Sequence, residues 1–178
     1  QIVLSLRNFS RLDEAEFKPV NLHEGIESTL LILQHRLKAS SKNPAIEVIR
    51  KYSELPMVEC YSSKLNQVFM NILANAIDAL EESIDSGNKE PTIVISTSEL
   101  LNKWVEIRIA DNGNGISEET SSKIFDPFFT TKPIGSGTGL GLSISHQIIT
   151  DKHGGKLECY STLGEGTEFV IQIKSNQP

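Results

Sequence analysis

Four motifs follow one another between residues 67 and 142, and their order constrains this chain more than any other feature. The first is a helical segment with carboxamides, and the second is a carboxylate beside glycines. The third is an aromatic and basic loop, and the fourth is a glycine-rich entry to a helix. They occupy residues 67–79, 111–116, 125–132 and 135–142. Each is a weak signal alone, but together they meet four requirements of one ligand, ATP with magnesium.

The size and charge of the chain limit its class. At 178 residues it suits one domain with a buried core. Its formal net charge of −6 and the lack of a Lys and Arg cluster argue against a nucleic-acid surface, because such binding depends on phosphate neutralisation. No stretch approaches the ~18 apolar residues of a membrane helix, and no basic leader precedes an apolar region. We therefore expect a soluble, cytoplasmic piece that contacts neither nucleic acid nor membrane, whether or not other parts anchor the full-length protein.

Thiols and imidazoles give little indication of a site. Cys60 and Cys159 fit no metal-ligand spacing and no framework of several disulfides, which favours two reduced cysteines in a cytosolic domain. The four histidines are scattered and form no ligand pair one helical turn apart. Neither a Gly-x-Ser-x-Gly elbow nor a Cys and His nucleophile arrangement is visible, so covalent hydrolysis has no support.

Hydrophobic periodicity predicts a mixture of helices and strands. Residues 1–16 have the partial helical spacing of a helix tail, and residues 17–20 form a short extended link. Asn21 with Glu24 predicts a capping box before a helix whose apolar positions continue to Leu37. Further strands are expected around residues 46–52, 57–60, 93–95, 105–109, 156–161 and 166–173, and further helices around residues 63–82, 117–123 and 139–153.

The helix of residues 63–82 combines a core face with a polar stripe. Its apolar side chains recur at helical spacing, and Asn71, Asn75 and Asp78 follow at i, i+4 and i+7 on a neighbouring stripe. Asparagine is a mediocre residue for a helix interior because its side chain competes for backbone hydrogen bonds. An amide oxygen is a suitable magnesium ligand. We therefore interpret the asparagines as ligand-binding residues, with a solvated or capping role as the alternative.

Asp111 is the sharpest single prediction. It ends a predicted strand, where a carboxylate can accept a hydrogen bond from the exocyclic amine of adenine. Gly113 and Gly115 would let the backbone approach the base closely. The alternative is an ordinary Asp-Asn-Gly turn between strands. The motifs that follow favour the ligand-binding interpretation.

The glycines of residues 135–141 alternate with other residues and expose backbone N–H groups at a predicted helix start, where phosphates bind well. A flexible hinge is the alternative. The segment is not a Walker loop, because no Gly-Lys-Ser or Gly-Lys-Thr follows, and it lacks the spacing of a dinucleotide fingerprint. Lys132 offers a positive charge for the outer phosphates, although a solvated loop lysine is the simpler explanation.

The ordered motifs resemble the ATP-binding catalytic domain of sensor histidine kinases, in the superfamily that also holds gyrase, the heat-shock chaperone ATPases and the mismatch-repair ATPases. The resemblance covers residues 18–174, and the motifs at 125–132 and 137–142 are specific to the kinase branch. Residues 6–11 look like the end of a second dimerisation helix. The resemblance therefore implies that residues 1–16 are the tail of that helix and residues 17–178 are the catalytic domain.

The resemblance implies an α+β fold of the Bergerat type: a two-layer sandwich of a mixed, mostly antiparallel sheet with three main helices on one face. It implies that Asn75 binds Mg²⁺, that Asn71 and Lys132 lie at the reacting phosphates, and that Thr167 supports the adenine-reading Asp111. The residues expected around ATP are Asn71, Asn75, Asp78, Asp111, Gly113, Gly115, Ile116, Phe125, Thr131, Lys132, Gly137, Thr138, Gly139, Leu140, Gly141, Leu142 and Thr167.

One departure from the ATPase branches favours phosphoryl transfer over hydrolysis. Relatives that hydrolyse ATP have a glutamate, as the water-activating base, where this chain has Asn71. An amide cannot take that proton, whereas transfer to a histidine nitrogen needs mainly alignment and charge neutralisation. The family's acceptor histidine would precede Gln1, and His23-Glu24 is better explained by the capping box. We expect this catalytic half not to autophosphorylate alone.

The expected partners are ATP, the histidine-bearing dimerisation domain of the same protein and the receiver domain of a response regulator. We expect the chain itself to be a monomer or to associate weakly through residues 1–16. One rival is a serine-directed kinase of the same fold, which residues 6–11 disfavour. Another is a degenerate module that senses nucleotide or docks a partner, which the intact glycines, Asn75 and Asp111 disfavour.

Overall fold

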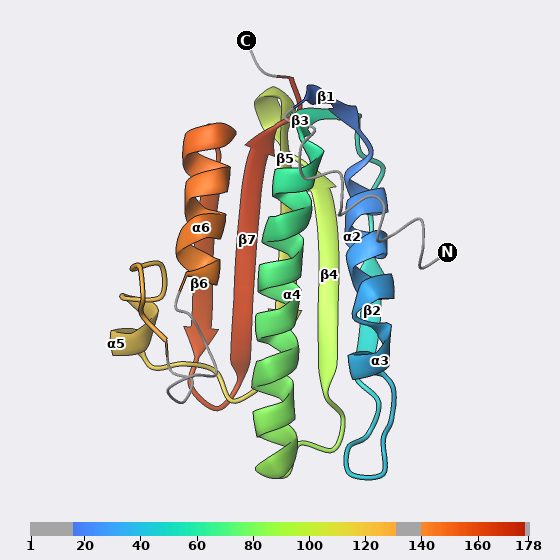
Figure 1. Cartoon of the computed structure of the whole chain (residues 1–178), viewed down its shortest axis with the longest axis vertical. Coiled ribbons are helices and arrows are strands. Elements are labelled where there is room, and N and C mark those ends of the chain that lie inside the picture. The colour runs from blue at the N-terminus through green and yellow to red at the C-terminus, as the bar shows by residue number, and fades with distance from the viewer. Residues whose placement is uncertain (1–15, 131–139, 177–178) are drawn as a thin grey trace.

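The computed structural model describes residues 16–130 and 140–176. Its centre is a five-stranded sheet in the order β2-β4-β5-β7-β6 (Figure 1). β2 runs parallel to β4, and every other neighbouring pair is antiparallel. The strands are β2 (Glu47–Lys51), β4 (Thr92–Glu99), β5 (Trp104–Asp111), β6 (Lys156–Thr162) and β7 (Gly166–Lys174). The predicted mixed, mostly antiparallel sheet is confirmed.

Three helices cover one face of this sheet: α2 (Leu22–Ile32), α4 (Ser62–Asp85) and α6 (Gly141–Gln147). Figure 1 shows them side by side in front of the strands, with α4 in the middle, and α4 contacts both of the others. The core lies between the two layers, where Phe69, Ile72 and Ile109 are almost completely buried. The predicted two-layer sandwich with three main helices on one face is therefore confirmed.

A second, two-stranded sheet pairs β1 (Phe17–Val20) with β3 (Val58–Tyr61) in antiparallel register. The sequence predicted only an extended link for residues 17–20, because a four-residue segment with a proline carries little strand signal. Residues 1–15 lie outside the described chain, so the predicted helix tail of residues 1–16 stays a prediction.

The first predicted helix is interrupted. α2 begins after Asn21, whose side chain accepts a hydrogen bond from the backbone N–H of His23 at 3.0 Å. It ends at Ile32, and after Leu33 a separate turn, α3 (Gln34–Leu37), completes the segment. The apolar pattern continues across this break, which is why periodicity alone predicted one helix.

The later elements are close to expectation. α5 (Glu118–Ser121) is shorter than the predicted helix. α6 continues as a π-helical turn over Ile148–Lys152, and the chain then leaves the helix at Gly154, whose φ of 60° is the expected left-handed stop. Among the described residues, no helix is both long and apolar enough to span a bilayer.

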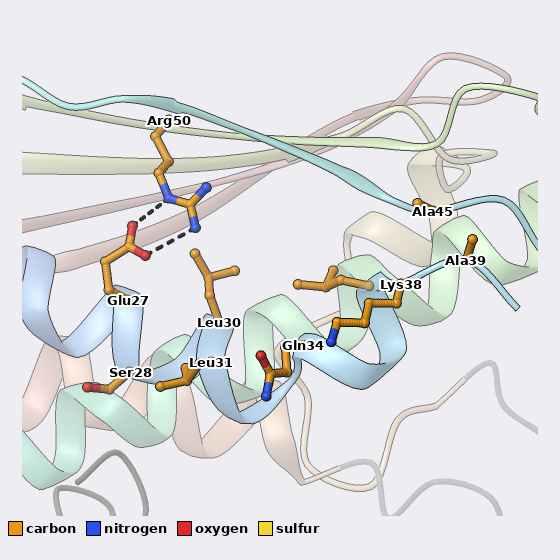
Figure 2. Close-up of a pocket in the computed structure, with 10 residues that line it drawn as sticks. Glu27, Ser28, Leu30, Leu31, Gln34, Lys38, Ala39, Ala45 and Arg50 are labelled. Carbon is orange, nitrogen blue, oxygen red and sulfur yellow. Dashed lines mark hydrogen bonds and ion pairs between the residues drawn. The ribbon is translucent and has the colours of Figure 1, made fainter. Parts of the chain in front are cut away.

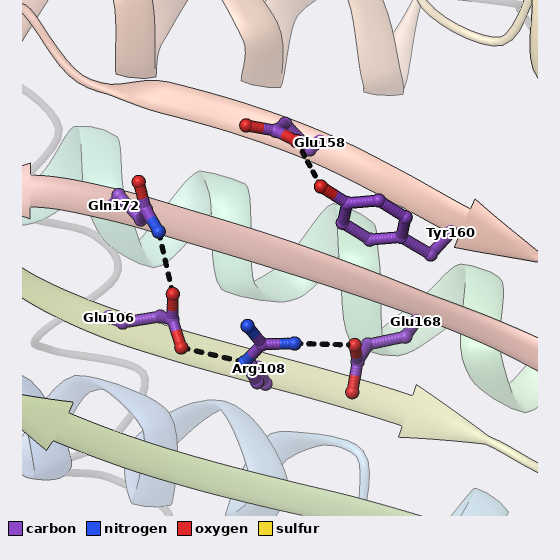
Figure 3. A network of polar contacts seen from close by, with 6 residues as sticks. All are labelled: Glu106, Arg108, Glu158, Tyr160, Glu168 and Gln172. Atoms are coloured by element: carbon purple, nitrogen blue, oxygen red, sulfur yellow. Dashed lines mark hydrogen bonds and ion pairs between the residues drawn. The ribbon is translucent and has the colours of Figure 1, made fainter.

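The face of the sheet opposite the helices carries a layer of polar side chains (Figure 3). Arg108 donates to Glu106 at 2.6 Å and to Glu168 at 2.8 Å. Gln172 donates to the second oxygen of Glu106 at 2.6 Å. These side chains form hydrogen bonds with one another across β5 and β7. The fold itself therefore provides partners for the charged groups of this network.

Candidate functional site

The site is built at one end of the central strands, on the face that the helices cover. Asp111 is the last residue of β5 and lies opposite Ile93 on one side and Thr167 on the other. Thr167 in turn lies opposite Ser161. Antiparallel register thus brings residues from four strands into one row, although they are far apart in sequence.

The Asp111 carboxyl is largely buried, and burial raises its pKa to about 6. The backbone N–H groups of Gly113 and Thr167 partly offset this, and Gly113 donates to Oδ1 at 2.9 Å. In the described part of the chain these offsetting groups are backbone dipoles, with no lysine or arginine among them. A buried carboxylate without a cation is a feature of ligand-binding and catalytic sites.

Gly113 and Gly115 are needed for close packing of the loop against the protein itself. A Cβ on Gly113 would approach Asp111 Oδ1 to 2.8 Å and the Ala79 carbonyl oxygen of α4 to 3.1 Å. Gly115 has a φ of 69°, and a Cβ there would run into the carbonyl oxygen of Thr162. The sequence predicted close approach to a base, which stays a prediction. The structure adds that the loop is fitted between α4 and the end of β6.

A hollow of about 600 Å³ opens beside Asp111. Cys159, Ser121 and Glu118 share its wall with Asp111 and Thr167. Sequence reasoning missed the first three. For Cys159 a signal exists, because period-two alternation along β6 places its side chain on the face that carries Ser161. Burial raises the pKa of the Cys159 thiol to about 11, so it is protonated at neutral pH.

Ser161 connects three parts of the site. Its hydroxyl accepts from the N–H of Ile116 at 2.9 Å, donates to the carbonyl of Gly166 at 2.9 Å and lies 2.9 Å from the Thr167 hydroxyl. The Thr167 side chain is therefore engaged with Ser161, and only its backbone N–H acts on Asp111. The predicted support of Asp111 by Thr167 in nucleotide binding stays a prediction, and the participation of Ser161 was not predicted.

Asn71 joins α4 to the first turn of α6. Its Nδ2 donates to the carbonyl of Gly141 at 3.0 Å and to the hydroxyl of Ser145 at 3.1 Å. Because a carbonyl can only accept, this contact fixes which amide atom faces α6. Both N–H groups of the amide are used here, and Oδ1 is the atom that can bind a ligand. Asn75 lies one turn later on α4 and is half-buried.

Asp78 is engaged elsewhere. Its carboxylate accepts from Arg36 of α3 at 2.7 Å, and the same guanidinium group reaches Glu81 at 3.1 Å. This ion pair joins α3 to α4 and offers a structural reason for Asp78. The predicted part of Asp78 in ligand binding has no support from this geometry.

The glycine-rich side of the site is described only in part. Thr131, Lys132, Gly137, Thr138 and Gly139 lie outside the described residues. On the described side, Phe125 packs on the ring of His146 with centroids 5.0 Å apart, Leu140 precedes α6, and Leu142 packs against the core. Their predicted contacts with a nucleotide stay predictions.

A larger hollow of about 720 Å³ lies between α2, α3 and β2 (Figure 2). Its wall is mainly aliphatic around Leu30 and Leu31, and the ion pair of Glu27 with Arg50 spans it from α2 to β2. It contains none of the motif residues. We therefore take the smaller hollow beside Asp111 as the candidate site, because the motif residue Asp111 lines it together with Thr167.

The chain is similar to proteins of one known family. Residues 60–177 match the family described as histidine kinase-, DNA gyrase B- and HSP90-like ATPases. The signal transduction histidine-protein kinase AtoS of Escherichia coli K12 is 33% identical over 177 residues, which cover 99% of this chain and 27% of AtoS. The chain spans 16–27% of the length of the curated relatives that are 33–34% identical to it.

Solved structures agree. The catalytic domain of histidine kinase ThkA is 32% identical and superposes with a TM-score of 0.74, covering 90% of this chain and 96% of that domain. ThkA has also been solved in complex with the response regulator protein TrrA; that chain is 28% identical with a TM-score of 0.71, covering 98% of this chain and 46% of that one. The chain therefore belongs to the histidine kinase-, DNA gyrase B- and HSP90-like ATPase family, and its fold is that of a histidine kinase catalytic domain.

Proposed function

We propose that this chain is the ATP-binding catalytic part of a two-component sensor histidine kinase. It would transfer the γ-phosphoryl group of ATP to a histidine on a dimerisation domain of the same protein. The observation that carries the proposal is the Asp111 carboxyl, which is buried at the end of β5 beside a hollow and has its pKa raised to about 6.

The chemistry of the hollow suits the base of ATP. An ionised carboxylate accepts hydrogen bonds only, and the exocyclic amine of adenine is a donor. The wall of the hollow combines small side chains such as Ser121, Cys159 and Thr167 with the larger Glu118, Tyr160, Glu165 and Glu168. We therefore assign Asp111 to adenine recognition.

Magnesium would be held on the α4 side of the site. The amide oxygen of Asn75 is a hard ligand of the kind that Mg²⁺ takes together with phosphate oxygens and water. The ion would neutralise charge on the phosphates. Asn71, which holds the start of α6 through Gly141 and Ser145, would keep that helix end in place near them.

Asn71 favours phosphoryl transfer over hydrolysis of ATP. Its Nδ2 donates two hydrogen bonds to α6, and an amide has no lone pair basic enough to activate water. Phosphoryl transfer relies on alignment and electrostatic stabilisation, which a site without a base can supply when the nucleophile is a histidine nitrogen.

The proposed protein partners follow from the relatives. ThkA has been solved with a response regulator, and we propose that a receiver domain likewise accepts the phosphoryl group from the full-length protein. The two cysteines, Cys60 and Cys159, are free thiols, which is consistent with the cytoplasmic location that we propose.

The test uses the full-length protein with ATP labelled at the γ-phosphate. We expect a phosphorylated product that is labile to acid and stable to base, because phosphohistidine hydrolyses in acid. Asp111→Asn should abolish labelling, whereas Glu106→Gln on the opposite face of the sheet should not. An acid-stable product would indicate the serine-directed kinase instead. Tight nucleotide binding without any labelled product would indicate a nucleotide-sensing module.

A further inference from the structure

Asn112 is the centre of a hydrogen-bonded cluster next to Asp111. Its Oδ1 accepts from the N–H of Thr92 at 2.8 Å, and its Nδ2 donates to the carbonyl of Glu90 at 2.9 Å. Its backbone N–H also reaches the Thr92 carbonyl at 3.3 Å. Asn112 directly follows β5, and its side chain therefore fixes the start of β4 beside the end of β5.

Asn88 extends the cluster to α4. Its Nδ2 lies 3.2 Å from the carbonyl oxygen of Asn112, 3.3 Å from Asn112 Oδ1 and 3.1 Å from the hydroxyl of Ser83, so its two hydrogens are shared among three acceptors. Its backbone N–H donates to the Ser83 carbonyl at 2.9 Å. Ser83 lies in the last turns of α4, where its own hydroxyl donates to Leu80.

The cluster spans the two elements that carry the candidate site. α4 carries Asn71 and Asn75, and β5 carries Asp111. Gly113, the next residue of the same loop, lies so close to α4 that an added Cβ would approach the Ala79 carbonyl oxygen to 3.1 Å. The loop after Asp111 is therefore hydrogen-bonded to α4 through the asparagine pair and packed against it at Gly113.

We propose that Asn112 and Asn88 are positioning residues that hold the Asp111 carboxyl at a fixed place relative to α4, so that the base and the phosphates of one nucleotide are recognised together. The proposal rests on the proposed nucleotide site. Neither asparagine is expected to touch the ligand, and both act through the loop.

A residue that positions Asp111 can be distinguished by measurement from a residue that only stabilises the loop. Asn112 is exposed, and losing exposed hydrogen bonds costs stability of only about 1 kcal/mol. Loss of a residue that only stabilises the loop would weaken the binding of every nucleotide alike. Misplacing Asp111, however, would remove a contact to the adenine amine that guanine cannot make, because guanine has a carbonyl at that position. The ratio of ATP affinity to GTP affinity is therefore the informative quantity.

The experiment measures calorimetric dissociation constants of this chain for ATP and GTP with magnesium. Asn112→Ala is expected to weaken ATP binding about 10-fold and GTP binding little, so that the preference for ATP falls. Asn112→Asp keeps the acceptor for Thr92 and should recover part of the preference. The matched control is Ser175→Ala, which removes a 3.1 Å side-chain hydrogen bond to the Lys103 carbonyl at the opposite end of the sheet.

Asn88→Ala should give a smaller loss of preference, and the double variant should lose less than the sum of the two, because both residues act through one loop. An unchanged ratio in Asn112→Ala, with wild-type protein that prefers ATP, would overturn the positioning role and leave the nucleotide site intact. Wild-type protein that bound neither nucleotide would overturn the proposed function and this inference together.

Discussion

Glu106 and Asp111 lie on the same strand, β5, but face opposite sides of the sheet. Their surroundings shift the two pKa values in opposite directions. Glu106 belongs to the open face. Burial alone would raise its pKa, but hydrogen bonds from Arg108 and Gln172 outweigh burial and lower it. Asp111 belongs to the face under the helices, and burial raises its pKa to about 6 with only backbone N–H groups opposing it.

The opposite pKa shifts distinguish a carboxylate with a structural role, Glu106, from a carboxylate that is available to a ligand, Asp111. Glu106 has cationic and amide partners that leave it little to offer another molecule. Asp111 keeps capacity to accept a donor, and its raised pKa, from 3.8 to about 6, corresponds to about 3 kcal/mol of unfavourable burial. Residues 16–130 and 140–176 supply no cation that offsets this cost, which indicates a site that a ligand completes.

The largest effect is expected where the backbone is fitted around Asp111. Gly166 has a φ of 137°, and a Cβ there would run into the Asp111 carbonyl oxygen. Gly166→Ala should reduce the free energy of unfolding by about 3–4 kcal/mol, from overpacking and backbone strain combined. Urea unfolding measures this.

Gly164→Ala is the matched control in the same turn. Gly164 also has a positive φ, of 86°, but nothing lies within 4 Å of its Cβ position. Gly164→Ala should lower the free energy of unfolding by only about 1 kcal/mol. Equal losses in the two variants would contradict the close fit around Asp111.

Asp111→Asn should stabilise the ligand-free protein at neutral pH by about 3 kcal/mol, because the burial of a carboxylate is removed. The folded pKa is raised, so wild-type stability is fully present below pH 3.8 and falls as pH rises through about 6. The advantage of the variant should therefore vanish near pH 4. Urea unfolding from pH 4 to 8 measures it, and a variant less stable than wild type at pH 7 would contradict the cost assigned to Asp111.

Arg108→Met tests the opposite face and should destabilise the protein by about 1 kcal/mol, since Arg108 is 41% exposed and part of its interaction is screened. Glu106 has a lowered pKa, so its stabilising contribution is present above pH 4.5 and is lost as pH falls. The difference from wild type should shrink in acid. Because Glu168, the second partner of Arg108, also lines the hollow beside Asp111, nucleotide affinity is compared in Glu106→Gln instead. It should not change there, and a loss of affinity would break the separation of the two faces.

The smallest effect concerns a thiol. A slow alkylating reagent should modify Cys159 less rapidly when ATP is bound, because Cys159 shares the hollow with Asp111. Cys60 provides an internal control, since it is buried in β3, away from this hollow. Mass spectrometry of each cysteine peptide gives both rates. Unchanged modification of Cys159 at saturating ATP would place the ligand elsewhere.

Much of this arrangement could be predicted because it depends on local pattern. The periodicity of residues 63–82 predicted α4, and alternation predicted the strands that deliver Asp111. The role predicted for Thr167 came from resemblance and stays a prediction, and strand register places Thr167 opposite Asp111.

What could not be predicted depends on tertiary contacts. The pairing of Asp78 with Arg36 requires the break between α2 and α3, which apolar spacing does not reveal. The attachment of Asn112 to α4 through Asn88 depends on the path of a polar loop. The hydrogen bonds of Ser161 to Ile116 and Thr167 were missed for the same reason, because they join residues that are far apart in the sequence.

The most direct test of the account is the shift in thermal unfolding that a slowly hydrolysed ATP analogue produces in wild type, Asp111→Asn and Glu106→Gln, in magnesium and in chelator. At a hundred times its dissociation constant the ligand should stabilise wild type by about 2.7 kcal/mol. We predict that this shift is larger with magnesium, is kept in Glu106→Gln and is lost in Asp111→Asn. An equal shift in Asp111→Asn and wild type would contradict the claim that the Asp111 carboxylate recognises the nucleotide.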